Sequence, residues 1–208
     1  MNLDEKDIDN EAPKTAAATD GAPEKKPANP VVSDILSYVK TILLAFAIAF
    51  FLTRFIIINC QVPTGSMLDT IQLKDRLIGS RLTYHFSEPQ RGDIVIFPCP
   101  DNDKIYIKRL MGLPGETIEV RDGKVYINGS DTPLDEPYVK EEYLGGRDFG
   151  PYTIPEGCYF MLGDHRNGSS DSRYWNTTCI KREDILAKAL FIYFPFNHID
   201  MLSEKHDY

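Results

Sequence analysis

Residue types that build several common kinds of site are scarce or scattered in this chain. It has only four histidines, and Cys60, Cys99, Cys158 and Cys179 form neither a C-x-x-C pair nor a group with histidine at metal-ligand spacing. No Lys/Arg-rich block is present and the formal net charge is -8, whereas binding nucleic-acid phosphates requires a basic face. We therefore expect no metal, no cofactor and no nucleic acid as a partner.

The four cysteines leave two alternatives open. Buried free thiols are the first expectation, because a chain of this size does not depend on covalent cross-links. The other is a disulfide between Cys158 and Cys179, which bracket the stretch 163–173 and could stiffen it.

Large apolar side chains are almost absent from residues 1–29, which mix Asp, Glu, Lys, Ala and Pro. Such a segment cannot bury enough surface to offset the entropy lost on ordering. It is also long and acidic, unlike a cleavable secretory leader. We predict a disordered tail over residues 1–34.

Ile35 to Ile58 form the one strongly apolar run, interrupted by a few polar residues and by Lys40 and Arg54. A helix of roughly 20 residues crosses a bilayer, and basic side chains near its ends can reach the headgroups. A buried helix of a soluble protein would normally show a polar face here. We predict one uncleaved membrane-spanning helix over 35–58, although the basic residues on both sides do not decide its orientation.

Short runs rich in β-branched and aromatic residues follow, at 76–80, 93–97, 105–111, 117–121, 124–127, 158–162 and 185–194. Asp122-Gly123 between two of them is a strong hairpin signal. Residues 132–155, rich in Pro, Gly and acidic side chains, indicate a loop-dominated excursion. The pattern predicts a mostly β, antiparallel domain over 59–208, tethered by the N-terminal helix.

A serine with the setting of a nucleophile comes directly after the apolar run. Ser66 lies between Gly65 and Met67 in a turn entered through Pro63, which constrains the backbone around its hydroxyl. Taken alone this is a weak signal, because these residues also gather in ordinary surface turns.

A serine nucleophile needs a base, and only His165 among the histidines has a motif-like setting, so a Ser-His-Asp triad has little support. A lysine can serve if burial lowers its pKa from about 10.4 to roughly 7 to 8. Strand alternation places Lys108 on the same face as Tyr106 and Leu110, among apolar neighbours. The alternative is an ordinary solvated lysine on an edge strand.

The stretch Gly163 to Arg173 is dense in charges and hydroxyls, yet it leaves an apolar strand. It could be a plain solvated loop. Alternatively, its Asp and Arg side chains pair to hold it rigid, while a serine hydroxyl orients the lysine amine.

The three stretches together resemble the bacterial type I signal peptidases, which are membrane-bound serine proteases with a Ser-Lys dyad. Pro63 to Ile71 is similar to the family's box P-S-x-S-M-x-P-T-L, with Thr64, Asp69 and Ile71 as departures. The box Y-[VI]-K-R-[VIL]-x-G-x-P-G is met in full by residues 106–115, and G-D-[IV]-V-x-F by residues 92–97. Residues 163–173 match G-D-N-R-x-N-S-x-D-S-R except for His165 and Gly168.

The resemblance implies a role for individual residues. Ser66 would be the nucleophile and Lys108 the general base. The Thr64 hydroxyl and the Ser66 backbone N–H would form the oxyanion hole, and Ser169 would orient Lys108. Charged residues near the site would be structural, namely Arg109, Asp164, Asp171 and Arg173.

The resemblance also implies an activity and a location. The substrates would be signal peptides of exported preproteins, cut after small residues and bound extended along a strand of the enzyme. The N-terminus would be cytoplasmic and the β domain extracytoplasmic, with the bilayer as a further partner. Two alternatives remain, a Ser-Lys enzyme dedicated to one exported protein, and a membrane-tethered adaptor that binds exported peptides without cutting. Intact Ser66 and Lys108 argue against the adaptor.

Overall fold

The structure is a computed structural model that describes residues 30–202. Most of the predicted tail, residues 1–29, lies outside the described residues. Residues 30–34, which we assigned to the tail, instead begin the first helix, with Pro30 at its start, a position where proline's missing N–H costs nothing.

Helix α1, Pro30–Phe51, continues into a π-helical turn at Leu52–Ile56. The 26 residues Val31–Ile56 have a mean hydropathy of 2.2, which makes this the one helix among residues 30–202 that is long and apolar enough to cross a membrane. Its large apolar side chains are exposed. The helix ends two residues before the predicted boundary, because Ile57 and Ile58 pair with Ser80 and Gly79 as the start of a strand.

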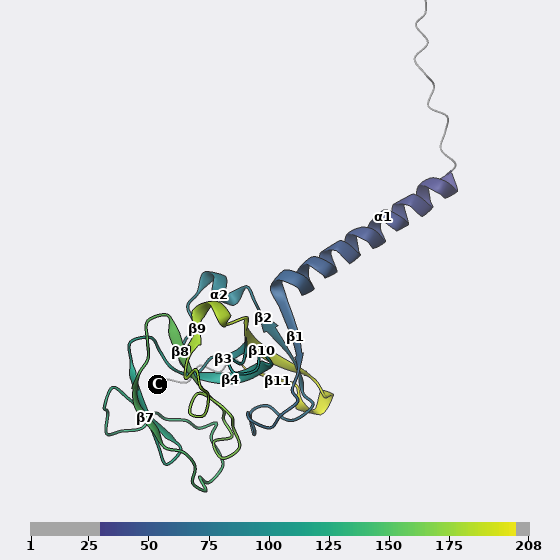
Figure 1. The fold of residues 1–208 in the computed structure, drawn as a ribbon. Coiled ribbons are helices and arrows are strands. Elements are labelled where there is room, and N and C mark those ends of the chain that lie inside the picture. Colours follow the sequence, from purple (N-terminus) through teal and green to yellow (C-terminus); the bar gives the residue numbers. More distant parts are fainter. Residues whose placement is uncertain (1–29, 203–208) are drawn as a thin grey trace, which may run out of the picture. The chain divides into compact units, whose positions relative to one another are not determined.

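The remaining described chain is a mostly β unit (Figure 1). Its strands are β1 Ile57–Gln61, β2 Arg76–Ser80, β3 Ile94–Pro98, β4 Ile105–Gly112, β5 Thr117–Arg121, β6 Lys124–Ile127, β7 Phe149–Thr153, β8 Cys158–Leu162, β9 Ile180–Lys181, β10 Ala187–Phe194 and β11 Asp200–Met201. One α-helical turn, α2 Thr83–Phe86, and two 3-10 turns, Arg182–Asp184 and Phe196–His198, complete it.

All described strand pairs are antiparallel, as predicted. The larger sheet has the order β1-β2-β10-β3-β4-β8-β9, with β11 added beside β10, and the smaller sheet has the order β6-β5-β7. The predicted hairpin is present, since Arg121 pairs with Lys124 across Asp122-Gly123. The sequence and the structure therefore agree on the fold class.

Three buried apolar clusters support these sheets. One joins the loop after β1 to the larger sheet through residues such as Met67, Ile71, Ile96 and Ile107. A second lies around Phe97, Leu110 and Trp175, and the third fills the space at the smaller sheet around Ile118, Ile154 and Phe160. Strand β4 contributes to all three clusters, so its side chains are fixed from both faces.

The stretch 132–155 is loop-dominated, as predicted, but it also contains a strand that was not predicted, because β7 pairs with β5 inside this range. The sequence Gly150-Pro151 concealed the strand, yet β7 is an edge strand of its sheet, where proline removes no essential ladder hydrogen bond.

Of the two alternatives for the cysteines, the structure has the first, since all four are free thiols, and it contradicts the Cys158–Cys179 disulfide. Pairing of Tyr159 with Ile180 already holds the two ends of the 163–173 stretch together without a covalent link. The two thiols are nevertheless neighbours. Burial, together with a hydrogen bond to Cys179, raises the pKa of the Cys158 thiol to about 11.

Candidate active site

Ser66 lies on the loop that connects β1 to β2. Backbone hydrogen bonds close the base of this loop, from Val62 N to Asp75 O and from Lys74 N to Val62 O, both at 2.9 Å. Met67 and Ile71 are buried in the first apolar cluster. The loop is therefore held at its base and along its length, and this fixes the backbone that carries Ser66.

Lys108 lies in the middle of β4, where it pairs with Val95 of β3. Its side chain is on the face of Tyr106, as alternation predicted, with Nζ 5.3 Å from the centre of the tyrosine ring. Lys108 is only 2% exposed. Burial lowers the pKa of its ammonium group to about 8, although the carboxylates of Asp171 and Asp164 act in the opposite direction.

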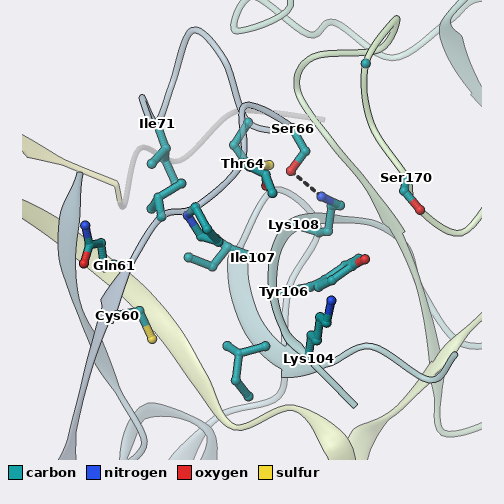
Figure 2. Close-up of a pocket in the computed structure, with 15 residues that line it drawn as sticks. Cys60, Gln61, Thr64, Ser66, Ile71, Lys104, Tyr106, Ile107, Lys108 and Ser170 are labelled. Carbon is teal, nitrogen blue, oxygen red and sulfur yellow. Dashed lines mark hydrogen bonds between the residues drawn. The ribbon is translucent and has the colours of Figure 1, made fainter. Parts of the chain in front are cut away.

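The two groups meet in the structure, with Lys108 Nζ 2.5 Å from Ser66 Oγ (Figure 2). Ser66 is 8% exposed, so the contact is shielded from bulk water. None of the histidines among residues 30–202 bonds to Ser66 Oγ. Among residues 30–202, Lys108 is therefore the group that lies in position to receive the proton of the Ser66 hydroxyl.

A cavity of about 730 Å³ opens beside this pair (Figure 2). Its lining is mainly apolar and comes from the serine loop, from β4 and from the 163–173 stretch: Cys60, Gln61, Val62, Pro63, Thr64, Ser66, Met67, Ile71, Lys104, Ile105, Tyr106, Ile107, Lys108, Gly168 and Ser170. Thr64 therefore faces the same space as Ser66. Within residues 30–202 the Ser66 backbone N–H has no acceptor, so it is available to a ligand.

Ser169 is buried beside the serine loop through a close backbone approach. A Cβ added at Gly163 would lie 2.1 Å from Ser169 Oγ and 2.4 Å from Ser66 O, so only glycine fits between them. Ser169 Oγ forms no hydrogen bond with any described residue. Its predicted bond to Lys108 is therefore not made in this conformation, and its orienting role stays a prediction.

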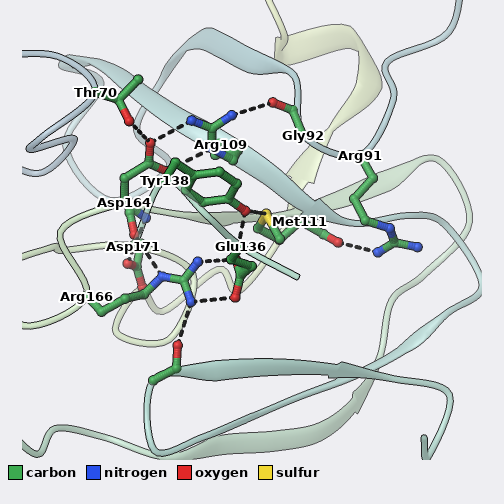
Figure 3. A network of polar contacts seen from close by, with 12 residues as sticks. Thr70, Arg91, Gly92, Arg109, Met111, Glu136, Tyr138, Asp164, Arg166 and Asp171 are labelled. Atoms are coloured by element: carbon green, nitrogen blue, oxygen red, sulfur yellow. Dashed lines mark hydrogen bonds and ion pairs between the residues drawn. The ribbon is translucent and has the colours of Figure 1, made fainter. Parts of the chain in front are cut away.

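The charged residues predicted to be structural form two buried pairs. Arg109 donates to Asp164 at 2.9 and 2.7 Å, and Thr70 Oγ1 donates to the same carboxylate at 2.6 Å (Figure 3). Arg173 donates to Asp171 through two bonds of 2.9 Å. Because Asp171 also accepts from Gly163 N at 3.1 Å, the second pair fixes the exit from β8.

Sequence reasoning missed a third buried pair, between Arg166 and Glu136 (Figure 3). Arg166 Nη1 donates to Glu136 Oε2 at 3.0 Å, and Tyr138 Oη donates to Glu136 Oε1 at 2.8 Å. A signal did exist, because the lysine box and the 163–173 stretch contain more arginines than aspartates, and a buried guanidinium needs a carboxylate from elsewhere.

Asp69 is not among the residues that line the cavity beside Ser66. It lines a separate cavity of about 370 Å³ together with residues that include Thr70, Arg109 and His198. The charge at the position of the family's proline is thus part of a different cavity from the one beside Ser66. Within residues 30–202, no cluster of three or more His, Cys, Asp or Glu side chains is arranged to hold a metal ion.

Comparisons with known proteins relate the chain to one peptidase family. Residues 35–194 match the model of the family described as signal peptidase, peptidase S26. The chain is 34% identical to a signal peptidase I of Leptolyngbya laminosa, over 96% of this chain and 98% of that protein. It is 36% identical to a signal peptidase I of Bacillus licheniformis, over 80% of this chain and 92% of that protein. A solved signal peptidase I from Enterococcus faecalis V583 is 41% identical, with a TM-score of 0.42, and covers 49% of this chain and 97% of its own.

Proposed function

The chain belongs to the signal peptidase family of serine peptidases, peptidase S26, and from that premise we propose that it removes signal peptides with Ser66 as nucleophile and Lys108 as general base. The observation that carries the assignment is the 2.5 Å contact between Ser66 Oγ and a lysine whose pKa burial lowers to about 8. A neutral amine at this position can accept the hydroxyl proton.

Acylation follows from this arrangement. Ser66 Oγ attacks the scissile carbonyl carbon as its proton moves to Lys108 Nζ, which gives a tetrahedral oxyanion and an ammonium group. When the C–N bond breaks, Lys108 returns the proton to the departing amine, the new N-terminus of the mature protein. The signal peptide remains bound to Ser66 as an ester.

Deacylation repeats these transfers with water. The neutral Lys108 amine takes a proton from a water molecule as its oxygen attacks the ester carbon. Collapse of the second oxyanion breaks the bond to Ser66 Oγ, which recovers a proton from Lys108. One peptide bond and one water molecule are consumed, and the enzyme is regenerated.

The oxyanion is stabilised by two donors that face the cavity. These are the Ser66 N–H, which has no acceptor within the described residues, and the hydroxyl of Thr64, which lines the same space. Fixed donors of this kind stabilise the charge that develops in the transition state more than the substrate carbonyl. In this proposal Ser169, whose buried hydroxyl has no partner among the described residues, is the group that orients Lys108.

The cavity supports cleavage after small residues. Val62, Met67, Ile71 and Ile107 make shallow apolar walls next to Ser66, and such walls accept small side chains of an extended peptide.

The apolar helix Val31–Ile56 anchors the enzyme in the bilayer that also holds the signal peptide. We place the N-terminus in the cytoplasm and the catalytic domain outside. Protease added to intact cells should then degrade the domain and spare the N-terminus; the reverse pattern would contradict this orientation.

The activity is tested with purified full-length chain in detergent, a panel of exported precursors, and mass spectrometry of the products. We expect single cuts after small residues, and no cuts by the Ser66→Ala variant. Specific binding of the precursors without cleavage by the unmodified chain would favour an adaptor. Cleavage of a single precursor from the panel would favour a dedicated processing enzyme.

A further inference from the structure

His165 makes three contacts, of which two connect the 163–173 stretch to the serine loop. Its backbone N–H donates to Ser66 O at 3.2 Å. Its ring Nδ1 lies 3.2 Å from Gly65 O, and its ring Nε2 lies 3.1 Å from Glu141 Oε2. None of these atoms is a reacting group, yet two of the three contacts are to carbonyl groups at the nucleophile.

The Gly65 carbonyl has a direct geometric relation to the oxyanion hole. It belongs to the same peptide unit as the Ser66 N–H, and this unit is trans. Because a peptide unit is planar, its C=O and N–H point in opposite directions and rotate together. A hydrogen bond that fixes Gly65 O therefore also fixes the direction of the Ser66 N–H. It also polarises the amide, which makes that N–H a stronger donor.

The Gly65 carbonyl defines what the ring nitrogen that faces it must carry. A backbone carbonyl can only accept, so the bond to Gly65 O requires a hydrogen on Nδ1. Glu141 is held by Asn167, whose backbone N and side-chain Nδ2 donate to it at 3.0 and 2.7 Å. The Glu141 carboxylate lies against Nε2, so the ring has a polar neighbour on each side.

Gly168 leaves the space that the ring occupies. A Cβ at this position would lie 2.5 Å from His165 Cε1 and 2.7 Å from Nδ1, closer than real contacts allow. His165 and Gly168 are the two departures from the family's box in this stretch, and the structure shows that they fit each other. A side chain at position 168 would push the ring away from Gly65.

We propose that His165 is a positioning residue that aligns the Ser66 N–H for the oxyanion by holding the Gly65 carbonyl, with Gly168 as its steric partner. This inference rests on the proposed function, because it assigns His165 a task within that mechanism. Glu141 completes the arrangement by holding the far side of the ring.

A matched pair of substitutions separates positioning from general support. Asn places an amide N–H₂ where His has Nδ1, whereas Gln places it nearer to Nε2. We expect His165→Gln to lower kcat about tenfold, a fraction of the loss caused by removing an oxyanion donor altogether. His165→Asn keeps a donor for Gly65 O, and we expect its kcat to stay within about threefold of the unmodified chain. KM should change little in either variant.

A second readout does not depend on the amount of folded enzyme. A substrate-like peptide aldehyde forms a tetrahedral adduct with Ser66, whereas the corresponding alcohol binds without an oxyanion. The ratio of their inhibition constants should favour the aldehyde about tenfold less in His165→Gln than in the unmodified chain. In His165→Asn this preference should be largely retained. Equal ratios in the two variants would overturn the proposal.

Gly168 provides the third test. Gly168→Ala should lower kcat because the methyl group displaces the ring, and the shorter side chain of His165→Asn should reduce that loss in the double variant. Strict additivity of the two effects would contradict the steric partnership. Failure of the unmodified chain to cleave any signal peptide would instead contradict the proposed function, so the two failures are distinguishable.

Discussion

Two buried cations lie next to each other on β4 and have opposite environments. Arg109 is 3% exposed, and Asp164 and the Gly92 carbonyl accept its hydrogen bonds (Figure 3). Lys108 is 2% exposed and faces the Ser66 hydroxyl, with no ion pair to a carboxylate among the described residues (Figure 2). Strand alternation turns the two side chains to opposite faces.

The comparison shows how one strand can hold two buried cations, one whose charge is compensated and one whose pKa is lowered. On the Arg109 face, the buried charge is compensated, so the guanidinium stays charged and the loops stay in place. On the Lys108 face, burial without an ion pair disfavours the charged form, and the pKa falls to about 8. The lowered pKa that the proposed mechanism needs thus comes from burial without an ion pair.

The largest expected effect comes from exchanging one cation for the other. Lys108→Arg should lower kcat by at least about a thousandfold, because arginine does not release its proton at any relevant pH. The matched control is Arg109→Lys, which keeps a charge on the other face and should retain turnover in the folded fraction. Cleavage of a leader peptide by both variants is followed by mass spectrometry. Near-normal turnover by Lys108→Arg would remove lysine from the mechanism.

Removing the Asp164 carboxylate beside Arg109 should cause the largest loss of stability. Asp164→Asn leaves the guanidinium without its carboxylate in a buried site, which should lower the free energy of unfolding by about 3 to 5 kcal/mol. Denaturant unfolding of the full chain in detergent measures this change. The double variant Arg109→Met/Asp164→Leu removes both charges and should lose much less. A loss below about 1 kcal/mol in Asp164→Asn would mean that the pair is effectively solvated.

Replacing Lys108, on the other face of β4, should change the free energy of unfolding in the opposite direction. The pKa of Lys108 is about 8 in the folded chain and 10.5 ordinarily, so the unfolded chain binds more protons between these values. Stability should therefore rise with pH across this window. Lys108→Met removes the cost of burying the charge but also loses the contact with Ser66. The net result should be a free energy of unfolding about 2 kcal/mol higher at pH 7. A destabilised Lys108→Met variant, or one whose advantage persists above pH 10.5, would contradict the environment assigned to Lys108.

The smallest effect is expected at Asp69. Its side chain lines the cavity on the Arg109 side and not the one beside Ser66. Asp69→Asn should change kcat/KM for a leader peptide by less than about twofold, as for a surface change away from special features. A clear change in the preferred cleavage site would show that this charge reaches the bound substrate.

Much of the β fold could be predicted from the sequence because its signals are local. The runs 117–121 and 124–127 are separated by Asp122-Gly123, a pair typical of a two-residue hairpin turn. The structure has strands with the same bounds. Strand β1 was hidden because Ile57 and Ile58 continue the apolar run of the helix, and only pairing with β2 separates them. The two-residue strands β9 and β11 have no run that could be recognised.

The residues of the site likewise divide into those that a local motif identifies and those that only the folded structure brings together. Ser66 and Lys108 stood out because each lies in a short motif, although the motifs identified them only together and through the family resemblance. The contacts of Glu136 with Arg166 and of Glu141 with His165 have no such local pattern. Both glutamates come from a stretch that was interpreted as an acidic loop, and their partners become neighbours only when β8 and the smaller sheet are assembled.

The central claim is that an uncharged Lys108 activates Ser66, and the pH dependence of kcat/KM for a leader peptide tests it most directly. Activity should increase tenfold per pH unit below a pKa of about 8 and level off above it, because only the neutral amine accepts the proton. The profile should keep this limb in the His165→Asn variant. A limb near pH 6.5, the ordinary range of histidine, or one that disappears with His165, would contradict the account.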